Sequence, residues 1–363
     1  MTLVKKLLTK LRGGKKTPKP KDSQSRITND TVAEHREKIL SEGRRYKYPL
    51  QYARHKQVIN AVAISAAALV ILLGLGYWQL YIVQNSSTFF YRITRIAPLP
   101  IASVDGEMAR YSDYLVNYRA AEHYLSKFDE ISPDSEDGQL QLRYKQRESL
   151  DIAIADAYAR QIAGKKNLSV SDKQVKEVLK GMRQAANGQL TEETSEASSQ
   201  RVLGLSSDDL YYLVENSLLR STAAFAVDDE AKQTVEEVKN QLAKHKDNFE
   251  KTAQLINKEN PDSVILGSSG MVNMSTNFGG INAKSIAQLD EGKVSGPIKS
   301  VTTDGYYFVK VLDRSDTQVS FTYLLVPLTK FDQGLKKLRD EGKIQEYISV
   351  DLPEEQATRQ KGE

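Results

Sequence analysis

The residue types that usually carry out chemistry in proteins are few and scattered in this sequence. It has no cysteine and four histidines, His35, His55, His123 and His245, which supply no recognisable ligand set for zinc or a transition metal. The Gly267-Ser268-Ser269-Gly270 run lacks the Lys-Ser/Thr pair of a phosphate-binding loop, and no serine lies in a G-x-S-x-G elbow. The carboxylates form no recognisable acid–base motif. These patterns predict no metal, no cofactor and no catalytic nucleophile.

Two groups of side chains could instead bind a partner through apolar contact. Met271, Met274 and Phe278 could line a peptide groove, or they could pack the core of their own domain. Flexible methionine and aromatic surfaces adapt to many partners. The second group is a run of tyrosines with helical spacing that could offer amphipathic contacts. It consists of Tyr111, Tyr114, Tyr118 and Tyr124.

The longest apolar run extends from Val58 to Val83 and contains no charged side chain. A helix of roughly 20 such residues spans the apolar core of a bilayer. Tyr77, Trp78 and Tyr81 gather at one end, as aromatic residues do at membrane interfaces. Because 57 residues precede the run and no small-residue cleavage pattern follows it, we expect a retained signal anchor rather than a cleaved signal peptide.

The charges on the two sides of this run predict its orientation. Residues 1–57 hold 16 Lys+Arg and 5 Asp+Glu, a net charge of +11, whereas the residues beyond Gln57 hold 35 and 42, a net charge of −7. Basic flanks stay in the cytoplasm, so we expect the N-terminus inside and the C-terminal portion outside. The tail is predicted to be largely disordered, above all in the Lys-rich segment 13–30. Nothing in it predicts specific nucleic-acid binding.

Residues 101–225 show four helical patterns separated by capping signals. One apolar stripe falls on residues 150–162, and Ser171 opens an S-x-x-Q capping box with Gln174. Three short motifs in this portion resemble those of SurA/PrsA/PpiD-type extracytoplasmic foldases, in the same order. They are Ile101-Ala102-Ser103-Val104-Asp105-Gly106-Glu107, Leu168-Ser169-Val170-Ser171-Asp172 and Leu203-Gly204-Leu205-Ser206, with a long helix at 140–163 between the first two. The resemblance implies a helical chaperone domain that begins with a short strand and turn.

The C-terminal portion resembles the parvulin fold, a small α/β domain whose members are peptidyl-prolyl cis-trans isomerases. Two motifs carry this match after a helical stretch at 235–256. They are Leu289-Asp290-Glu291-Gly292-Lys293-Val294-Ser295-Gly296-Pro297-Ile298 and Gly305-Tyr306-Tyr307-Phe308-Val309-Lys310-Val311-Leu312-Asp313. The resemblance implies a proline-binding cleft.

The sequence departs from the parvulin pattern at that cleft. The family places one histidine in its first strand ("ARHIL") and one in its last ("GYHI"). Tyr307 stands at the second position, and Ala224, in the best candidate strand 223–227, stands at the first. The apolar pocket of the family aligns with Phe278 and Asn282, so half of it is polar. Isomerisation works by binding the twisted amide and needs no nucleophile, so these losses predict weak or absent activity.

Together these observations predict an α+β protein with one transmembrane helix, an all-α chaperone-like domain and a small parvulin-like α/β domain. The expected segments are a cytoplasmic tail (1–57), the span (58–83), a linker (84–100), a helical domain (101–225), a parvulin-like domain (226–313), an appended strand and helix (314–353) and a disordered end (354–363). The predicted function is a membrane-anchored foldase or chaperone that binds unfolded, newly exported polypeptides at the outer face of a bacterial membrane.

Two alternatives remain open: an active parvulin-type isomerase, and a structural subunit of an envelope or secretion complex. The expected partners are unfolded polypeptides, membrane lipid along residues 58–83 and secretion machinery. The predicted client-binding residues combine both groups with the degenerate cleft. They are Met271, Met274, Phe278, Asn282, Tyr307, Tyr111, Tyr114 and Tyr118.

Overall fold

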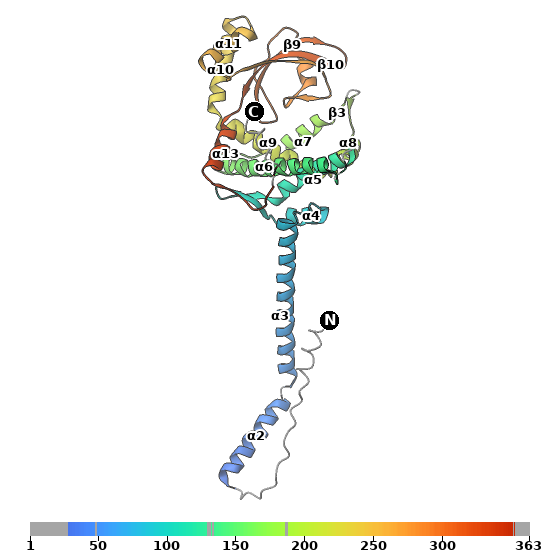
Figure 1. Cartoon of the computed structure of the whole chain (residues 1–363), viewed down its shortest axis with the longest axis vertical. Helices are drawn as coiled ribbons and strands as arrows, with labels where there is room; N and C mark the ends of the chain where they lie inside the picture. Colours follow the sequence, from blue (N-terminus) through green and yellow to red (C-terminus); the bar gives the residue numbers. More distant parts are fainter. Residues whose placement is uncertain are drawn as a thin grey trace. The chain divides into compact units, whose positions relative to one another are not determined.

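The computed structural model describes residues 28–47, 49–128, 132, 134–185, 188–350 and 352 (Figure 1). The chain divides into two compact units, Met1–Leu75 and Gly76–Glu363. The architecture mixes helices and antiparallel sheets, which confirms the α+β prediction. Residues 1–27, which hold most of the predicted disordered tail, and the predicted C-terminal tail 354–363 lie outside the described residues.

The first unit contains α2 (Asn29–Lys47) and most of α3 (Pro49–Tyr77). Within the described residues one helix is long and apolar enough to cross a membrane, His55–Ile82. The helices α2 and α3 correct the prediction of a largely disordered tail, since residues 29–47 and 49–57 are helical. The reason is local: residues 31–47 are rich in helix-forming Ala, Glu, Lys, Arg and Leu, and proline returns only at Pro49, where it begins the next helix.

The second unit begins with a segment that was predicted to be a linker. Residues 78–82 form η1, a π-helical turn, and α4 follows at Thr88–Ile96. Leu80, Tyr91 and Thr94 are buried against the rest of this unit. Residues 84–100 are therefore a packed part of the second unit, because Tyr91 and Thr94 of α4 are buried in it.

A small antiparallel sheet with the order β11-β1-β2 follows. Its strands are β1 (Pro100–Val104), β2 (Glu107–Arg110) and β11 (Ile344–Glu346). The predicted strand and turn at 101–107 are confirmed, with Asp105 and Gly106 at positive φ angles of 49° and 88° between β1 and β2. Both residue types tolerate this left-handed conformation.

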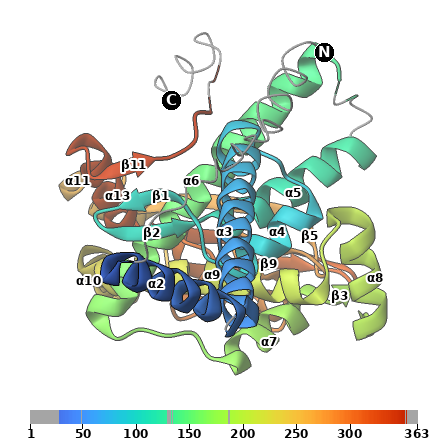
Figure 2. The ribbon, with the colours of Figure 1, turned by 90° about the horizontal axis from the view of Figure 1, so that it is seen from below.

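Five helices build the helical portion of the second unit (Figures 1 and 2). They are α5 (Tyr111–Phe128), α6 (Glu136–Lys166), α7 (Asp172–Met182), α8 (Glu192–Leu203) and α9 (Ser207–Val227), with the two-residue strands β3 (Gln184–Ala185) and β4 (Gly188–Gln189) between α7 and α8. The predicted capping box is present at the start of α7, where Ser171 and Gln174 exchange side-chain to backbone hydrogen bonds. A second capping box joins Ser206 and Asp209 at the start of α9.

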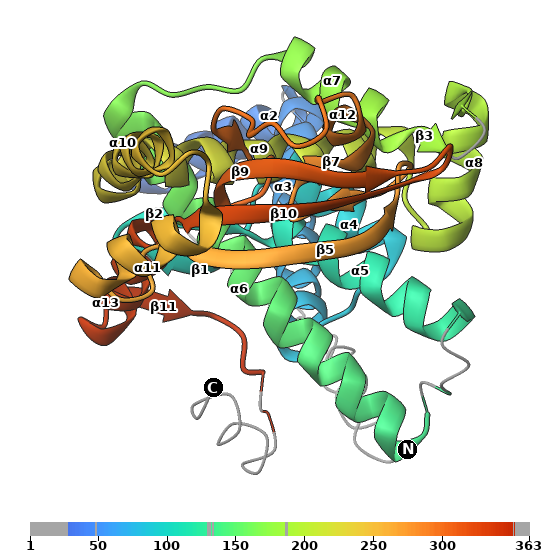
Figure 3. The ribbon, with the colours of Figure 1, turned by 90° about the horizontal axis from the view of Figure 1, so that it is seen from above.

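The second sheet has the strand order β5-β10-β9-β8 and is antiparallel throughout (Figure 3). Its strands are β5 (Ile265–Asn273), β10 (Gln318–Pro327), β9 (Gly305–Arg314) and β8 (Ile298–Lys299). The remaining elements of this part are α10 (Asp229–Lys244), α11 (Phe249–Glu259), the hairpin of β6 (Asn277–Phe278) and β7 (Ile281–Asn282), and α12 (Ala283–Ala287).

The position of β10 corrects the predicted boundary at residue 313. The segment 314–353 is not an addition to a complete domain, because β10 lies between β5 and β9 and pairs with both. Phe321 and Leu324 of β10 are fully buried, which fits a strand covered on both faces. Within this segment β10 therefore completes the second sheet, and β11 completes the first.

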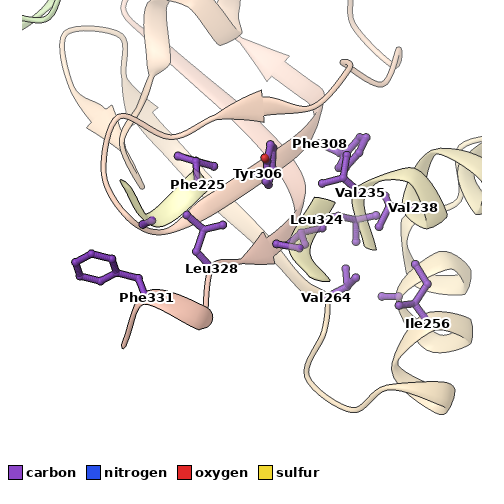
Figure 4. Packing of buried hydrophobic residues seen from close by; sticks show 14 of the residues in the cluster. Phe225, Val235, Val238, Ile256, Val264, Tyr306, Phe308, Leu324, Leu328 and Phe331 are labelled. Carbon is purple, nitrogen blue, oxygen red and sulfur yellow. The ribbon is translucent and has the colours of Figure 1, made fainter. Parts of the chain in front are cut away.

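One hydrophobic core joins the helical portion to the second sheet (Figure 4). Phe225 of α9 meets Tyr306 of β9 edge to face, with ring centroids 4.9 Å apart. Phe331, in α13 (Lys330–Asp340), lies against Tyr158 of α6 with a centroid distance of 4.9 Å. The two portions thus share buried side chains and do not pack as separate bodies.

The C-terminal segment also returns to the helical portion through charges. Arg147 of α6 contacts Glu346 of β11 at 2.7 Å, and Arg339 of α13 contacts Asp151 of α6 at 2.9 Å. These half-exposed pairs individually contribute little stability, but the four groups form one network. The network holds the end of the chain beside the first sheet.

A chain that stops after Asp313 should fail to form the second sheet, because β5 and β9 then have no common partner. A chain that stops after Val350 keeps every described strand and should unfold like the full protein. Urea unfolding followed by circular dichroism in detergent measures both. A cooperative transition of the shorter chain at the same urea concentration as the full protein would contradict the central role of β10.

Candidate functional site

The aromatic residues predicted to line the cleft do come together. Phe278 of β6 and Tyr307 of β9 both contact Tyr323 of β10. The ring centroid of Tyr323 lies 5.3 Å from that of Phe278 and 5.5 Å from that of Tyr307. Phe278 also meets Phe321 edge to face at 5.3 Å. Met274 packs against the same cluster. The alternative left open for Met274 and Phe278, that they pack their own domain, is therefore the one that the structure supports.

Tyr307 is a buried member of this cluster, in ring contact with Tyr323. Its side chain is 3% exposed, and its hydroxyl lies directly against the backbone of Gly279, where a Cβ would collide with it. Burial raises the pKa of the Tyr307 hydroxyl above its usual value, and the nearby carboxylate of Asp304 raises it further. The phenol stays neutral across the physiological range, so it can exchange hydrogen bonds but cannot act as a base.

The structure differs from the prediction for Ala224, the residue assigned to the first cleft-histidine position. Ala224 is not in a strand: it is a buried residue of α9. The strand beside β9 is β10, and its Tyr323 is the residue whose ring approaches Tyr307. The ring of Tyr323 lies over Gly267 of the neighbouring β5, where a Cβ would meet it.

A sequence signal for this arrangement exists. Thr322-Tyr323-Leu324-Leu325 parallels the "R-H-I-L" of the family's first strand, with tyrosine in place of histidine. This segment was not predicted as the family's first strand because it follows β9 in the sequence, whereas the family's first strand precedes the helices of the domain. The structure thus places Tyr323 beside Tyr307, the residue that the resemblance aligns with one cleft histidine.

The comparison with protein families agrees with this geometry. Residues 218–313 match the family model described as Rotamase: PPIC-type PPIASE domain. This chain carries a PPIC-type PPIase domain. No curated protein and no solved structure matches the chain significantly. The matched range begins inside α9 and ends in β9, so β10, which completes the sheet of the PPIC-type domain, lies beyond it.

The other residues predicted for client binding take different positions. Asn282 caps α12 by accepting a hydrogen bond from the backbone N–H of Ser285 at 3.1 Å. Met271 lies on the edge strand β5, 47% exposed and apart from the aromatic cluster. The fold therefore separates Met271 from Met274 and Phe278, whereas Asn282 lies in the same hairpin as Phe278.

The tyrosine run of α5 is part of the core, which corrects its predicted role in binding. Tyr111, Tyr114 and Tyr118 are 0 to 5% exposed, and their rings pack on one another at about 5.7 Å. Tyr111 donates a hydrogen bond to the backbone carbonyl of Leu80. Such side chains cannot reach a client unless α5 leaves its place. Tyr124, which is 41% exposed, remains accessible.

The two histidines of the second unit lie in other places. His123 of α5 is hydrogen-bonded to the carbonyl of Arg201 at 2.9 Å, and His245 follows the end of α10. Among the described residues no three His, Cys, Asp or Glu side chains lie close enough to hold a metal ion.

An open groove does lie beside the aromatic cluster, on the side of the helical portion. Its volume is about 610 Å³, within the roughly 300–1,000 Å³ typical of ligand sites. One wall comes from α7 and from Leu218 of α9, and the other from the β6–α12 segment and Val301. Its lining mixes apolar and polar groups, including Val178, Leu218 and Val301 with Glu177, Asn277 and Asn282.

We expect the full chain to give no measurable acceleration of prolyl cis-trans isomerisation, because the buried ring of Tyr307 stands where the parvulin resemblance places a cleft histidine. The measurement is a peptide isomerisation assay across several residues preceding proline, with an active PPIC-type isomerase as the positive control. Acceleration by this chain that disappears in Tyr307→Ala or Phe278→Ala would show that the cleft opens and is catalytic.

Proposed function

We propose that this protein is a membrane-anchored extracytoplasmic foldase that binds unfolded polypeptides and does not depend on prolyl isomerisation. The observation that carries the proposal is the burial of Tyr307 against Gly279 in a domain that keeps the PPIC-type fold. A proline ring has no room at that position. A PPIC-type domain without a proline site still offers a peptide-binding surface near the filled cleft.

The groove between α7 and the β6–α12 segment is the proposed client site. It is open on one side, and its polar groups stand between apolar contacts, which suits a chain with mixed side chains. Exposed side chains of both charge signs, Glu177, Lys180 and Lys284, line it. Several weak contacts of this kind permit binding of many sequences and release without a chemical step.

Membrane anchoring is supported by the apolar helix His55–Ile82 and by the charge difference on its two sides. The basic side of a span stays in the cytoplasm, so the PPIC-type domain lies outside. Tethering near the site where exported chains emerge raises the local concentration of the client-binding groove.

The client site is tested by light scattering of a chemically denatured protein diluted into buffer with the full chain in nanodiscs. Because the helical portion and the second sheet share one core, the experiment uses the full chain and no separate fragments. Val301→Asp places a charge in the groove, where Val301 is 39% exposed. Desolvating an unpaired carboxylate costs at least ~1–3 kcal/mol, so about tenfold more protein should be needed for half protection.

Leu312→Asp is the matched control, since Leu312 is 55% exposed on β9 and lies outside the groove lining. It should protect the client as the unchanged chain does. Equal loss in both variants, or no protection by the unchanged chain at several-fold excess, would contradict the proposed client site. Failure of the unchanged chain to protect would favour the alternative of a structural subunit with a fixed partner.

Orientation is tested with single cysteines, because the natural chain has none. Asn240→Cys on α10 should react with a membrane-impermeant maleimide in intact spheroplasts. Ser41→Cys on α2 should react only after lysis; both positions are exposed. The reverse pattern would place the PPIC-type domain in the cytoplasm and would exclude a role in export.

A further inference from the structure

The helix α4 has one face fixed to the ectodomain. Tyr91 donates a hydrogen bond to Asp209 of α9 at 2.6 Å, and Thr94 is buried beside it. Arg119 of α5 donates to the hydroxyl of Thr88 at 2.7 Å, and its guanidinium lies 4.9 Å from the ring centre of Tyr91. The helix therefore cannot rotate about its axis without breaking buried contacts.

The opposite face of α4 is apolar and exposed. Phe89, Ile93 and Ile96 are 67%, 36% and 86% exposed and are spaced as i, i+4 and i+7 along the helix. This spacing places all three on one side. Arg92 is exposed next to this row, whereas the guanidinium of Arg95 lies 3.6 Å from the ring centre of Tyr212. An apolar row with an adjacent arginine is the pattern of a helix that lies in a membrane interface.

The end of the membrane-spanning helix belongs to the same compact unit as α4. Leu80 of η1 is 2% exposed, and Tyr81 donates a hydrogen bond to the carbonyl of Pro100 at 2.6 Å. Gln84 donates to the carbonyl of Ser349 at 2.9 Å. Between Ile82 and Thr88 the chain therefore has fixed contacts, and α4 begins six residues after the apolar helix ends.

We infer that α4 lies in the outer headgroup layer of the bilayer, with Phe89, Ile93 and Ile96 at the acyl boundary and Arg92 beside lipid phosphates. This inference rests on the proposed membrane anchoring. The partner is a phospholipid surface, because an apolar face this close to the end of a span meets lipid before any soluble molecule. The exposed aromatic residues Trp78 and Tyr347, at 50% and 44%, extend the same interface. The contact fixes which side of the PPIC-type domain faces away from the membrane.

Spin labels on single cysteines test this contact in the full chain. The chain is reconstituted as one copy per nanodisc of phosphatidylglycerol and phosphatidylcholine, and each label is probed with oxygen, which concentrates in lipid, and with a water-soluble nickel chelate. Labels at Phe89→Cys and Ile96→Cys should show an oxygen-to-nickel accessibility ratio several-fold above that of Asn240→Cys, the aqueous control. Leu72→Cys, inside the apolar helix, is the control for the span.

Each outcome has a distinct meaning. Nickel accessibility at positions 89 and 96 equal to that at Asn240→Cys, with Leu72→Cys deep in lipid, overturns the inference and leaves the anchoring intact. Low accessibility to both reagents at 89 and 96 means that protein covers α4, which also overturns it. A water-accessible label at Leu72→Cys overturns the membrane anchoring itself.

A second variant tests whether the apolar row causes the contact. Ile93→Asp should lower the oxygen-to-nickel ratio of the label at Ile96→Cys several-fold, because the carboxylate draws this face towards water. Val301→Asp, at a residue of similar exposure in the groove, should leave that ratio unchanged. An unchanged ratio in Ile93→Asp would show that α4 is held near the membrane by the span alone.

Discussion

The second unit depends on one pairing constraint: β10 must lie between β5 and β9. This single strand gives β5 its partner, brings Tyr323 beside Tyr307 and directs the chain through Leu328 and Phe331 towards α6. The strand β11, which follows α13, then closes the first sheet against β1. The helical portion and the PPIC-type domain are joined because the same segment completes both.

The aromatic cluster of the PPIC-type domain lies where the family resemblance predicted a cleft. Tyr307 stands at the position that the resemblance gives to one cleft histidine, and the ring of Tyr323 lies beside it. Glycines at 267 and 279 leave room for the two rings, since a Cβ at either position would collide with them. Together with Phe278 and Phe321, the two tyrosines contribute buried apolar surface that stabilises the domain.

Features determined by a few neighbouring residues could be predicted from the sequence. The apolar helix, the Asp105-Gly106 turn and the capping box of Ser171 each follow from local composition and spacing. The place of β10 could not be predicted in this way, because strand order depends on pairing between residues far apart in the chain. The helical period likewise indicated that Tyr111, Tyr114 and Tyr118 share a face, but it could not show that η1 and the neighbouring helices cover that face.

The lateness of β10 also has a consequence for biosynthesis. A chain that emerges from its N-terminus first exposes β1 and β5 well before the segment that pairs with them, residues 318–346, becomes available. Until then these strands have open edges that can pair with other chains. The second unit therefore completes its fold only after residue 346 has been made. For that interval this protein, which we propose assists the folding of others, is itself an incompletely folded chain.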